Sequence, residues 1–312
     1  MTTDAVADAA TKRRAAAVSV ASNMTQIAFK LAAGIATGSV SILTEAAHST
    51  TDLIASLVAF VSVRKADEPA DADHLYGHAK VENVAAAIEG VLILFGAVLI
   101  TYESVRKLIE GSHVRRLGLG IAVIGISAVA NAAVSVYVGR RARETDSPAL
   151  EGDAAHLSSD AGTSVAVLLG LVAVQATGET WIDPVVALCV AVAIVVAGVR
   201  ILRRSSRALV DEALPEEELE TIRSAVIEFG GEHAVVGYHR LRARRAGSQR
   251  HVDLHVQFAA GTTLEEAHRT AHQLQAAISA RLGGADILIH LEPEDRVQPG
   301  TEIPAADGAK AD

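Results

Sequence analysis

The sequence is poor in cysteine, in aromatic residues and in basic charge. Cys189 is the single cysteine, which excludes an intrachain disulfide and a cysteine-rich zinc site. The chain holds 28 Lys and Arg against 37 Asp and Glu, so its formal charge is −9. We expect no nucleic-acid partner, because binding to phosphates requires a basic face. Only 3% of the residues are aromatic, yet 50% are hydrophobic and the mean hydropathy is +0.30, which indicates a membrane-embedded part joined to a water-soluble part.

Six apolar stretches are long enough to cross a lipid bilayer as helices, which takes about 20 residues each. They cover residues 15–36, 39–63, 83–102, 117–138, 154–177 and 185–199, and the last stretch reaches the required length because it can be extended in both directions. The segments that would face the cytoplasm carry most of the flanking Lys and Arg, and the loop after residue 102 is the exception. By the positive-inside rule we expect a multi-pass protein of the cell membrane with both termini in the cytoplasm.

The composition becomes more polar after about residue 208, and the residue pattern there predicts a small soluble domain. The expected elements are a helix over 215–229, strands over 235–243 and 251–258 joined by a turn at 244–248, a helix over 263–282 and a strand over 286–291. The expected fold is therefore an α-helical membrane protein with six transmembrane helices and a C-terminal cytoplasmic α-β-β-α-β domain. We predict a disordered tail over 1–14, the transmembrane domain over 15–208, the cytoplasmic domain over 209–293 and a second disordered tail over 294–312.

Two of the six stretches, 39–63 and 154–177, contain polar residues in the same pattern, His-x-x-x-Asp. These are the pairs His48/Asp52 and His156/Asp160. A spacing of four places both side chains on one face of a helix. Ionisable groups inside a membrane cost about 2.5–3.5 kcal/mol each on insertion scales, so they indicate a function by default. Two such faces turned toward each other supply a tetrahedral shell of two imidazoles and two carboxylates for a metal ion. The alternative is that each pair is a hydrogen bond that holds helices together.

Further residues of the ligand type lie near these pairs. Glu45 and Asp153 each precede one of the histidines by three residues, and we interpret them as supporting or vestibule residues rather than as direct ligands. The loop after the second span predicts a second metal site, although polar loops hold such residues by chance as well. Its candidate ligands are Asp71, His74 and His78.

Together these motifs resemble those of the cation diffusion facilitator family of divalent metal/proton antiporters. The matching segments are residues 37–52, 76–82, 153–160, 183–184 and 239–255, and the resemblance covers about residues 15–293. It implies a V-shaped homodimer in the lipid bilayer, a transport site formed by the two His-x-x-x-Asp pairs and a loop site at Asp71, His74 and His78. It also implies that the cytoplasmic domain binds metal near the dimer interface, through positions that match His239, His255, His268, His290 and Glu292.

Two further residue roles that the resemblance implies match the family less directly. Glu292 stands where an aspartate is common in relatives, and Lys80 and Asp211 match positions that form a salt bridge between protomers there. Histidines on a small domain are often only solvated surface residues, which is our interpretation of His233, His251 and His272.

A four-fold shell of nitrogen and oxygen ligands suits Zn²⁺, whereas an all-oxygen shell would suit Mg²⁺ or Mn²⁺ better. Fe²⁺, Mn²⁺, Cd²⁺, Co²⁺ and Ni²⁺ stay open as alternatives. Only a neutral imidazole binds metal, so protons compete with the ion and are the expected counter-ion. We expect a transporter and not an enzyme, since the chain has no His-Glu-x-x-His motif and a closed shell leaves no position for catalytic water. A metal sensor that signals through its soluble domain is the third alternative.

Overall fold

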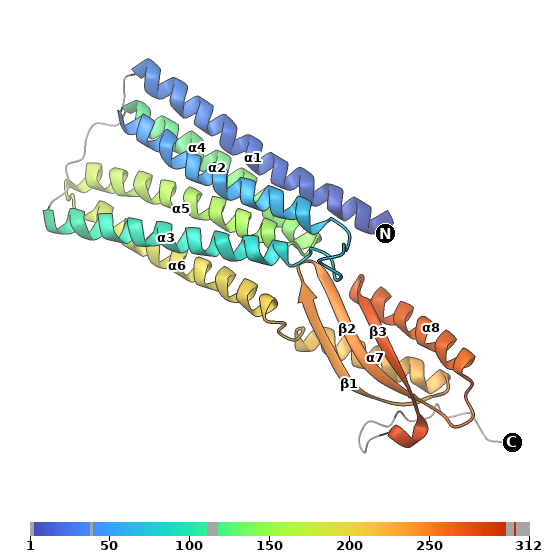
Figure 1. The fold of residues 1–312 in the computed structure, drawn as a ribbon. Helices are drawn as coiled ribbons and strands as arrows, with labels where there is room; N and C mark the ends of the chain where they lie inside the picture. The colour runs from blue at the N-terminus through green and yellow to red at the C-terminus, as the bar shows by residue number, and fades with distance from the viewer. Residues whose placement is uncertain (1–2, 38–39, 111–117, 298–302, 304–312) are drawn as a thin grey trace. The chain divides into compact units, whose positions relative to one another are not determined.

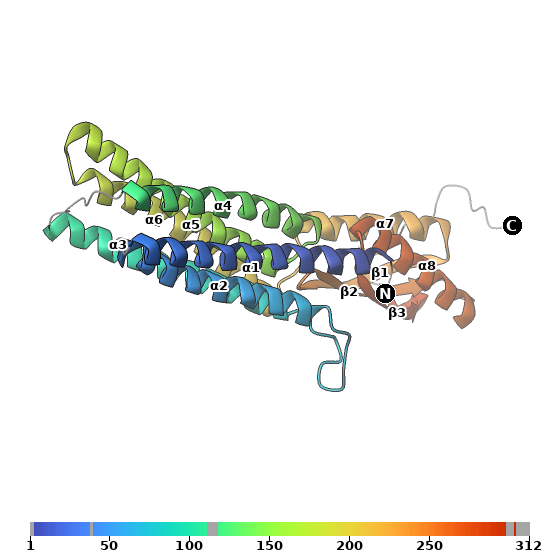
Figure 2. The same cartoon turned by 90° about the horizontal axis from the view of Figure 1, so that it is seen from above.

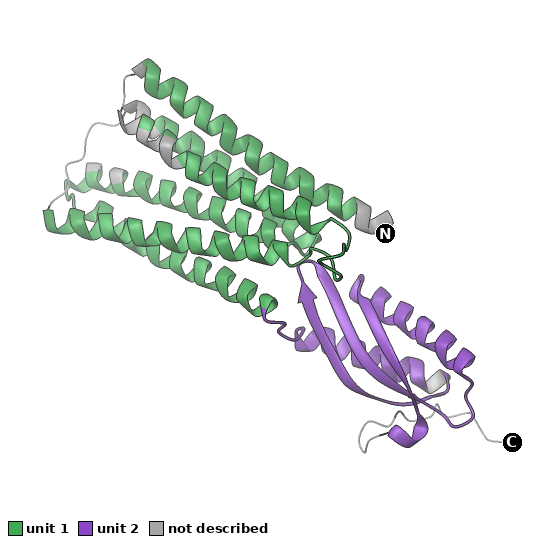
Figure 3. Cartoon of the chain, viewed as in Figure 1, with its two compact units in different colours: residues 1–209 green, residues 210–312 purple. Residues whose placement is uncertain are grey.

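The computed structural model describes residues 3–37, 40–110, 118–297 and 303. The side chains of some helical residues lie outside this description, among them those of Glu45 and His48. The chain divides into two compact units, Met1–Leu209 and Val210–Asp312 (Figure 3). Each unit has its own cluster of buried hydrophobic side chains.

Within the described residues, unit 1 is a bundle of six long helices that run side by side in both views (Figure 1; Figure 2). They are α1 (Thr3–Thr37), α2 (Val40–Ala66), α3 (Val81–Glu110), α4 (Gly118–Glu144), α5 (Pro148–Thr177) and α6 (Ile182–Leu209). Among the described residues, α3, α4, α5 and α6 are long and apolar enough to cross a membrane. That α1 and α2 also span it stays a prediction.

Glycines allow α5 and α6 to approach α3 closely. A Cβ atom added to Gly152 of α5 would lie 3.0 Å from Cβ of Glu89, and one added to Gly198 of α6 would lie 2.9 Å from Cγ of Leu94. Carbon atoms in a packed interior rarely approach so closely, so a larger residue at either position would require the neighbouring side chains or helices to shift.

The prediction of a disordered N-terminal tail over 1–14 is wrong for its described part, because α1 begins at Thr3. Lys12 provides the physical reason. Its side chain is only 7% exposed, and its Nζ lies 2.8 Å from Oε1 of Glu82 on α3 and 3.7 Å from Oδ1 of Asp67. These contacts hold the first turns of α1 against the bundle.

The C-terminal tail predicted over 294–312 is also partly ordered. Glu294–Arg296 forms a 3-10 turn, and the backbone N–H of Ile303 donates to the carbonyl of Val236 at 3.0 Å. The Ile303 side chain is buried in the core of unit 2, and burial of an aliphatic side chain favours this ordered position.

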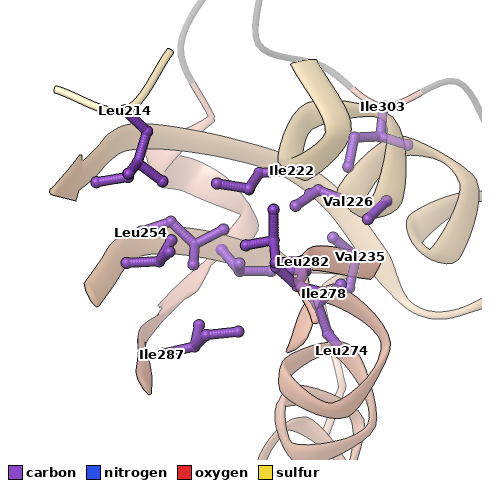
Figure 4. Close-up of a cluster of buried hydrophobic side chains, with 14 of the residues drawn as sticks. Leu214, Ile222, Val226, Val235, Leu254, Leu274, Ile278, Leu282, Ile287 and Ile303 are labelled. Carbon is purple, nitrogen blue, oxygen red and sulfur yellow. The ribbon is translucent and has the colours of Figure 1, made fainter. Parts of the chain in front are cut away.

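Unit 2 is a three-stranded sheet packed against two helices. Its elements are α7 (Glu216–Glu232), β1 (Val235–Ala246), β2 (Gln249–Phe258), α8 (Leu264–Leu282) and β3 (Asp286–Pro293). The strand order is β1-β2-β3, with β1 and β2 antiparallel and β2 and β3 parallel. Ile222 and Val226 of α7 meet Leu254 of β2 and Leu274 and Ile278 of α8 in its core (Figure 4).

Most elements of unit 2 form where the sequence predicts them. The capping box of Thr263 and Glu266 begins α8 as predicted, but the predicted turn at 244–248 is too long. Residues 244–246 continue β1, and Ala246 pairs with Gln249. The turn is tight because Gly247 adopts a φ of 57°, which a glycine accepts without strain.

Candidate metal centre

Helices α2 and α5 bring three of the predicted ligands together inside the bundle. Nε2 of His156 lies 3.7 Å from Oδ1 of Asp52 and 3.7 Å from Oδ2 of Asp160. Asp52 is 6% exposed and His156 is 7% exposed, and one ligand atom of each of the three residues lies within 4.8 Å of the others. Zinc binds nitrogen and oxygen ligands at about 2.0–2.2 Å, so donor atoms at these separations can share one ion.

The fourth predicted ligand, His48, lies one helical turn before Asp52 on α2, but its side chain is outside the described residues. The side chain of Glu45 is also outside the described residues. The structure therefore assembles Asp52, His156 and Asp160, whereas the place of His48 in the shell stays a prediction.

A third helix contributes a carboxylate that the sequence reasoning left without a role. Glu89 of α3 is fully buried, and its Oε2 lies 3.7 Å from Nδ1 of His156. Its only signal in the sequence was that it is the single charge in an otherwise apolar span. Asp153 is buried as well, and it accepts a hydrogen bond of 3.0 Å from Ser19 on α1. This contact agrees with a supporting role for Asp153.

The loop between α2 and α3 gathers the second predicted cluster, and Figure 2 shows this loop extending from the ends of the helices. Oδ1 of Asp71 lies 3.2 Å from Nδ1 of His74, and Oδ2 of Asp71 lies 3.2 Å from Nε2 of His78. The backbone N–H of His74 donates to Asp71 at 2.7 Å, and this bond is the main cause that lowers the pKa of the Asp71 carboxyl. An ionised Asp71 beside two imidazoles is a suitable donor set for a divalent ion.

The third cluster is formed by the register of the sheet in unit 2. His239 of β1 pairs with His255 of β2, which pairs with His290 of β3. Glu292 accepts hydrogen bonds from Nε2 of His239 at 2.8 Å and from Nδ1 of His255 at 2.7 Å. Nε2 of His290 lies 3.9 Å from Oε1 of Glu292. The predicted residues of three strands therefore meet at one point of the sheet.

Electrostatics keep the carboxyl of Glu292 ionised. Burial by itself would raise its pKa, but the hydrogen bonds from His255, Gln257 and His239 outweigh that effect and lower the pKa to about 2. Gln257 was missed by the sequence reasoning. Its Nε2 donates to Oε2 of Glu292 at 2.8 Å, because Gln257 and Glu292 are paired positions of β2 and β3.

His268 is not part of this cluster in one chain. It lies exposed on α8, where its ring centroid is 4.4 Å from that of His272. The expected pair of Lys80 and Asp211 belongs to two protomers, and one chain does not test it. Here Asp211 lies 3.2 Å from Arg244, and Nζ of Lys80 donates to the carbonyl of Leu209 at 3.5 Å.

Two family models match most of the chain. The model of the cation efflux transmembrane domain matches residues 16–210, and the model of the cation efflux protein cytoplasmic domain matches residues 214–294. The chain belongs to the cation diffusion facilitator family. As a member of this cation efflux family, it is a transporter of the membrane, as the sequence resemblance predicted.

Relatives match this cation efflux protein over nearly their whole length. It is 33% identical to an uncharacterized transporter of Synechocystis over 278 residues, which are 89% of each chain. It is 33% identical to the cation-efflux pump FieF of Shewanella oneidensis over 288 residues, which are 92% of this chain and 96% of that one. A solved structure of CzrB in its Zn form, described as a candidate zinc transporter, is 36% identical and covers 28% of this chain and 98% of its own, with a TM-score of 0.27.

Proposed function

We propose that this protein exports a divalent metal ion from the cytoplasm in exchange for protons, and that His48, Asp52, His156 and Asp160 hold the ion. The observation that carries this function is the meeting of Asp52, His156 and Asp160 between α2 and α5, within the matched cation efflux domain. Buried carboxylates at this depth need a positive partner, because an isolated charge in a membrane is costly. A metal ion or protons can serve as that partner in turn.

Zinc is the ion that fits the donor set best. One imidazole nitrogen and two carboxylate oxygens already lie within 4.8 Å of one another, and His48 would add a second nitrogen. Mixed nitrogen and oxygen shells of four ligands suit Zn²⁺, and Fe²⁺, Mn²⁺, Cd²⁺, Co²⁺ and Ni²⁺ are the alternatives. Selection among them depends on the coordination geometry of the loaded site.

Protons provide the exchange partner through the same histidine. An imidazole binds metal only when its ligating nitrogen is deprotonated, so loading of the ion releases a proton, and protonation expels the ion. His156 is a suitable exchange point, because its Nε2 faces both carboxylates. Alternating exposure of this site to the two sides of the membrane turns the competition into antiport.

The remaining expectations describe the assembly. We propose a homodimer with six spans and both termini in the cytoplasm, in which the cytoplasmic cluster binds regulatory metal. His239, His255 and Glu292 support such a site because they already share hydrogen bonds, and Nδ1 of His239 is buried with no hydrogen-bond partner among the described residues. His290 and the exposed His268 would complete it, the latter from the partner protomer. Metal that bridges two protomers would bias the inward-facing against the outward-facing state.

The direct test is metal flux in proteoliposomes under an imposed pH gradient, measured for Zn²⁺ and each alternative ion in turn. We expect Zn²⁺ flux in the unmodified protein and none in the Asp160→Ala variant, since its shell lacks one carboxylate. Glu151→Gln is the matched control, because it removes a carboxylate from the same helix that pairs with Arg204 away from the cluster. Equal flux in the Asp160→Ala variant and the unmodified protein would contradict the transport site.

A further inference from the structure

We infer that Glu89 of α3 is a positioning residue for the transport site: it accepts a hydrogen bond from Nδ1 of His156 and so directs Nε2 toward the ion. The inference rests on the proposed transport function and adds a third helix to the site. It also assigns a purpose to a charge that the two His-x-x-x-Asp motifs leave out.

The two nitrogens of the His156 ring face different partners. Nε2 points to Asp52 and Asp160, each at 3.7 Å, whereas Nδ1 points to Oε2 of Glu89, also at 3.7 Å. The ring thus lies between a pair of candidate ligands on one side and a lone carboxylate on the other. Only one of its nitrogens can bind an ion shared with Asp52 and Asp160, and the second nitrogen is left for Glu89.

Glu89 has no competing task among the described residues. It is fully buried, and neither of its carboxylate oxygens has a hydrogen-bond partner there. Both ring nitrogens of His156 lack a hydrogen-bond partner there as well. A buried carboxylate without a donor is costly, so Glu89 needs a donor, and Nδ1 of His156 lies 3.7 Å from its Oε2.

The packing of the helices holds Glu89 in this place. Gly152 lies one helical turn before His156 on α5, and a Cβ atom there would lie 3.0 Å from Cβ and 3.1 Å from Cγ of Glu89. The side chain of Glu89 therefore lies directly against the backbone of α5. This contact directs its carboxylate along α5 toward His156.

The chemistry of metal-binding histidines supplies the last step. A histidine that ligates through one nitrogen almost always donates the N–H of the other to a carboxylate, a carbonyl or water, which fixes the ring orientation. The observed 3.7 Å is slightly longer than a hydrogen bond, whose upper limit is about 3.2 Å, and a small rotation of the ring toward an ion can close the gap. Ligation at Nε2 and the hydrogen bond at Nδ1 then stabilise each other.

Two substitutions of similar size separate positioning from packing. Glu89→Leu fills the space without an acceptor, and Glu89→Gln keeps an oxygen that can accept the N–H of His156. We would measure KM and kcat for Zn²⁺ flux in proteoliposomes. We would also measure Co²⁺ affinity by visible absorption, on the full chain in detergent with His78 and His255 replaced by alanine in every sample. Glu103→Gln, at an exposed carboxylate of α3 that pairs with Arg106, is the control.

We expect Glu89→Leu to weaken Co²⁺ binding and raise KM by about 10- to 100-fold, as is typical when a carboxylate behind a metal-binding histidine is lost. Glu89→Gln should lose clearly less, and the control should match the unmodified protein. A Leu variant with unaltered affinity and KM would overturn the inference, and so would equal losses in the Leu and Gln variants. If the unmodified protein moves no divalent metal, the proposed function fails. If it does, and Asp160→Ala stops it while Glu89→Leu does not change it, only the role of Glu89 fails.

Discussion

Lys12 of α1 and Glu82 of α3 form a buried ion pair, with Nζ of Lys12 2.8 Å from Oε1 of Glu82. The second oxygen of Glu82 accepts a hydrogen bond from Ser147, the N-cap residue of α5. Three helices that are far apart in the sequence are thus joined at one carboxylate. Because Glu82 is 1% exposed, the pair is shielded from water, and each member depends on the other.

Removal of Lys12 is therefore expected to destabilise unit 1. Lys12→Met leaves a buried carboxylate without its cation, and breaking a buried ion pair in this way costs about 3–5 kcal/mol. The measurement is thermal unfolding of the purified protein in detergent. The control is Arg14→Met, since Arg14 is exposed and such surface substitutions change stability by about 0.5 kcal/mol or less. Equal losses in both variants would contradict the role of the pair.

Because α5 contacts α3 closely at Gly152, we expect a glycine-to-alanine substitution to destabilise the protein there but not at Gly96. Gly152→Ala places a Cβ atom 3.0 Å from Glu89, so we expect a loss of about 1–3 kcal/mol, as overpacking typically costs, together with lower flux. Gly96→Ala on α3 meets no atom within 4 Å and should be neutral or stabilise by up to about 1 kcal/mol. Unfolding and flux of both variants test this. A Gly152→Ala protein as stable and as active as the unmodified one would contradict it.

Acid should destabilise unit 2 through Glu292. The pKa of this carboxyl is about 2 in the folded state and 4.5 in its ordinary state, so the folded state gains stability when Glu292 is ionised. The gain is complete above the ordinary pKa, and it is lost as the pH falls from about 4.5 to about 2. The shift corresponds to roughly 3 kcal/mol.

Urea unfolding of isolated residues 210–312 as a function of pH measures this loss. Glu292→Gln is the matched variant, because its amide does not titrate, so its stability should fall less steeply between pH 4.5 and 2. Parallel pH profiles of the two proteins would show that other groups cause the acid sensitivity.

Zinc binding by unit 2 should depend on the residues that meet across the sheet. We expect calorimetry of isolated residues 210–312 to show Zn²⁺ binding that His255→Ala abolishes, since His255 lies between His239 and His290. His233→Ala is the control, because His233 is exposed near the end of α7. A fragment that binds no zinc, or binds it equally well in both variants, would contradict a regulatory site at this cluster.

Much of the site was predictable because its chemistry repeats at helical spacing. A spacing of four placed His156 and Asp160 on one face of α5, and costly charges in apolar spans drew attention to them. The roles of Glu89 and Gln257 were not predictable in this way. Glu89 lies on α3, which carries neither His-x-x-x-Asp pair, and Gln257 acts on Glu292 of the neighbouring strand β3, so neither role belongs to a repeated pattern.

The sequence by itself determined the family, the division into a membrane part and a soluble part, and the identity of most candidate ligands. Periodicity and local motifs carry that information along the chain. Only the tertiary structure decided that Lys12 is buried, that the tails are partly ordered, and that Glu89 faces His156. These features depend on how closely helices approach one another, which is set by packing at residues such as Gly152 that carry no chemical signal of their own.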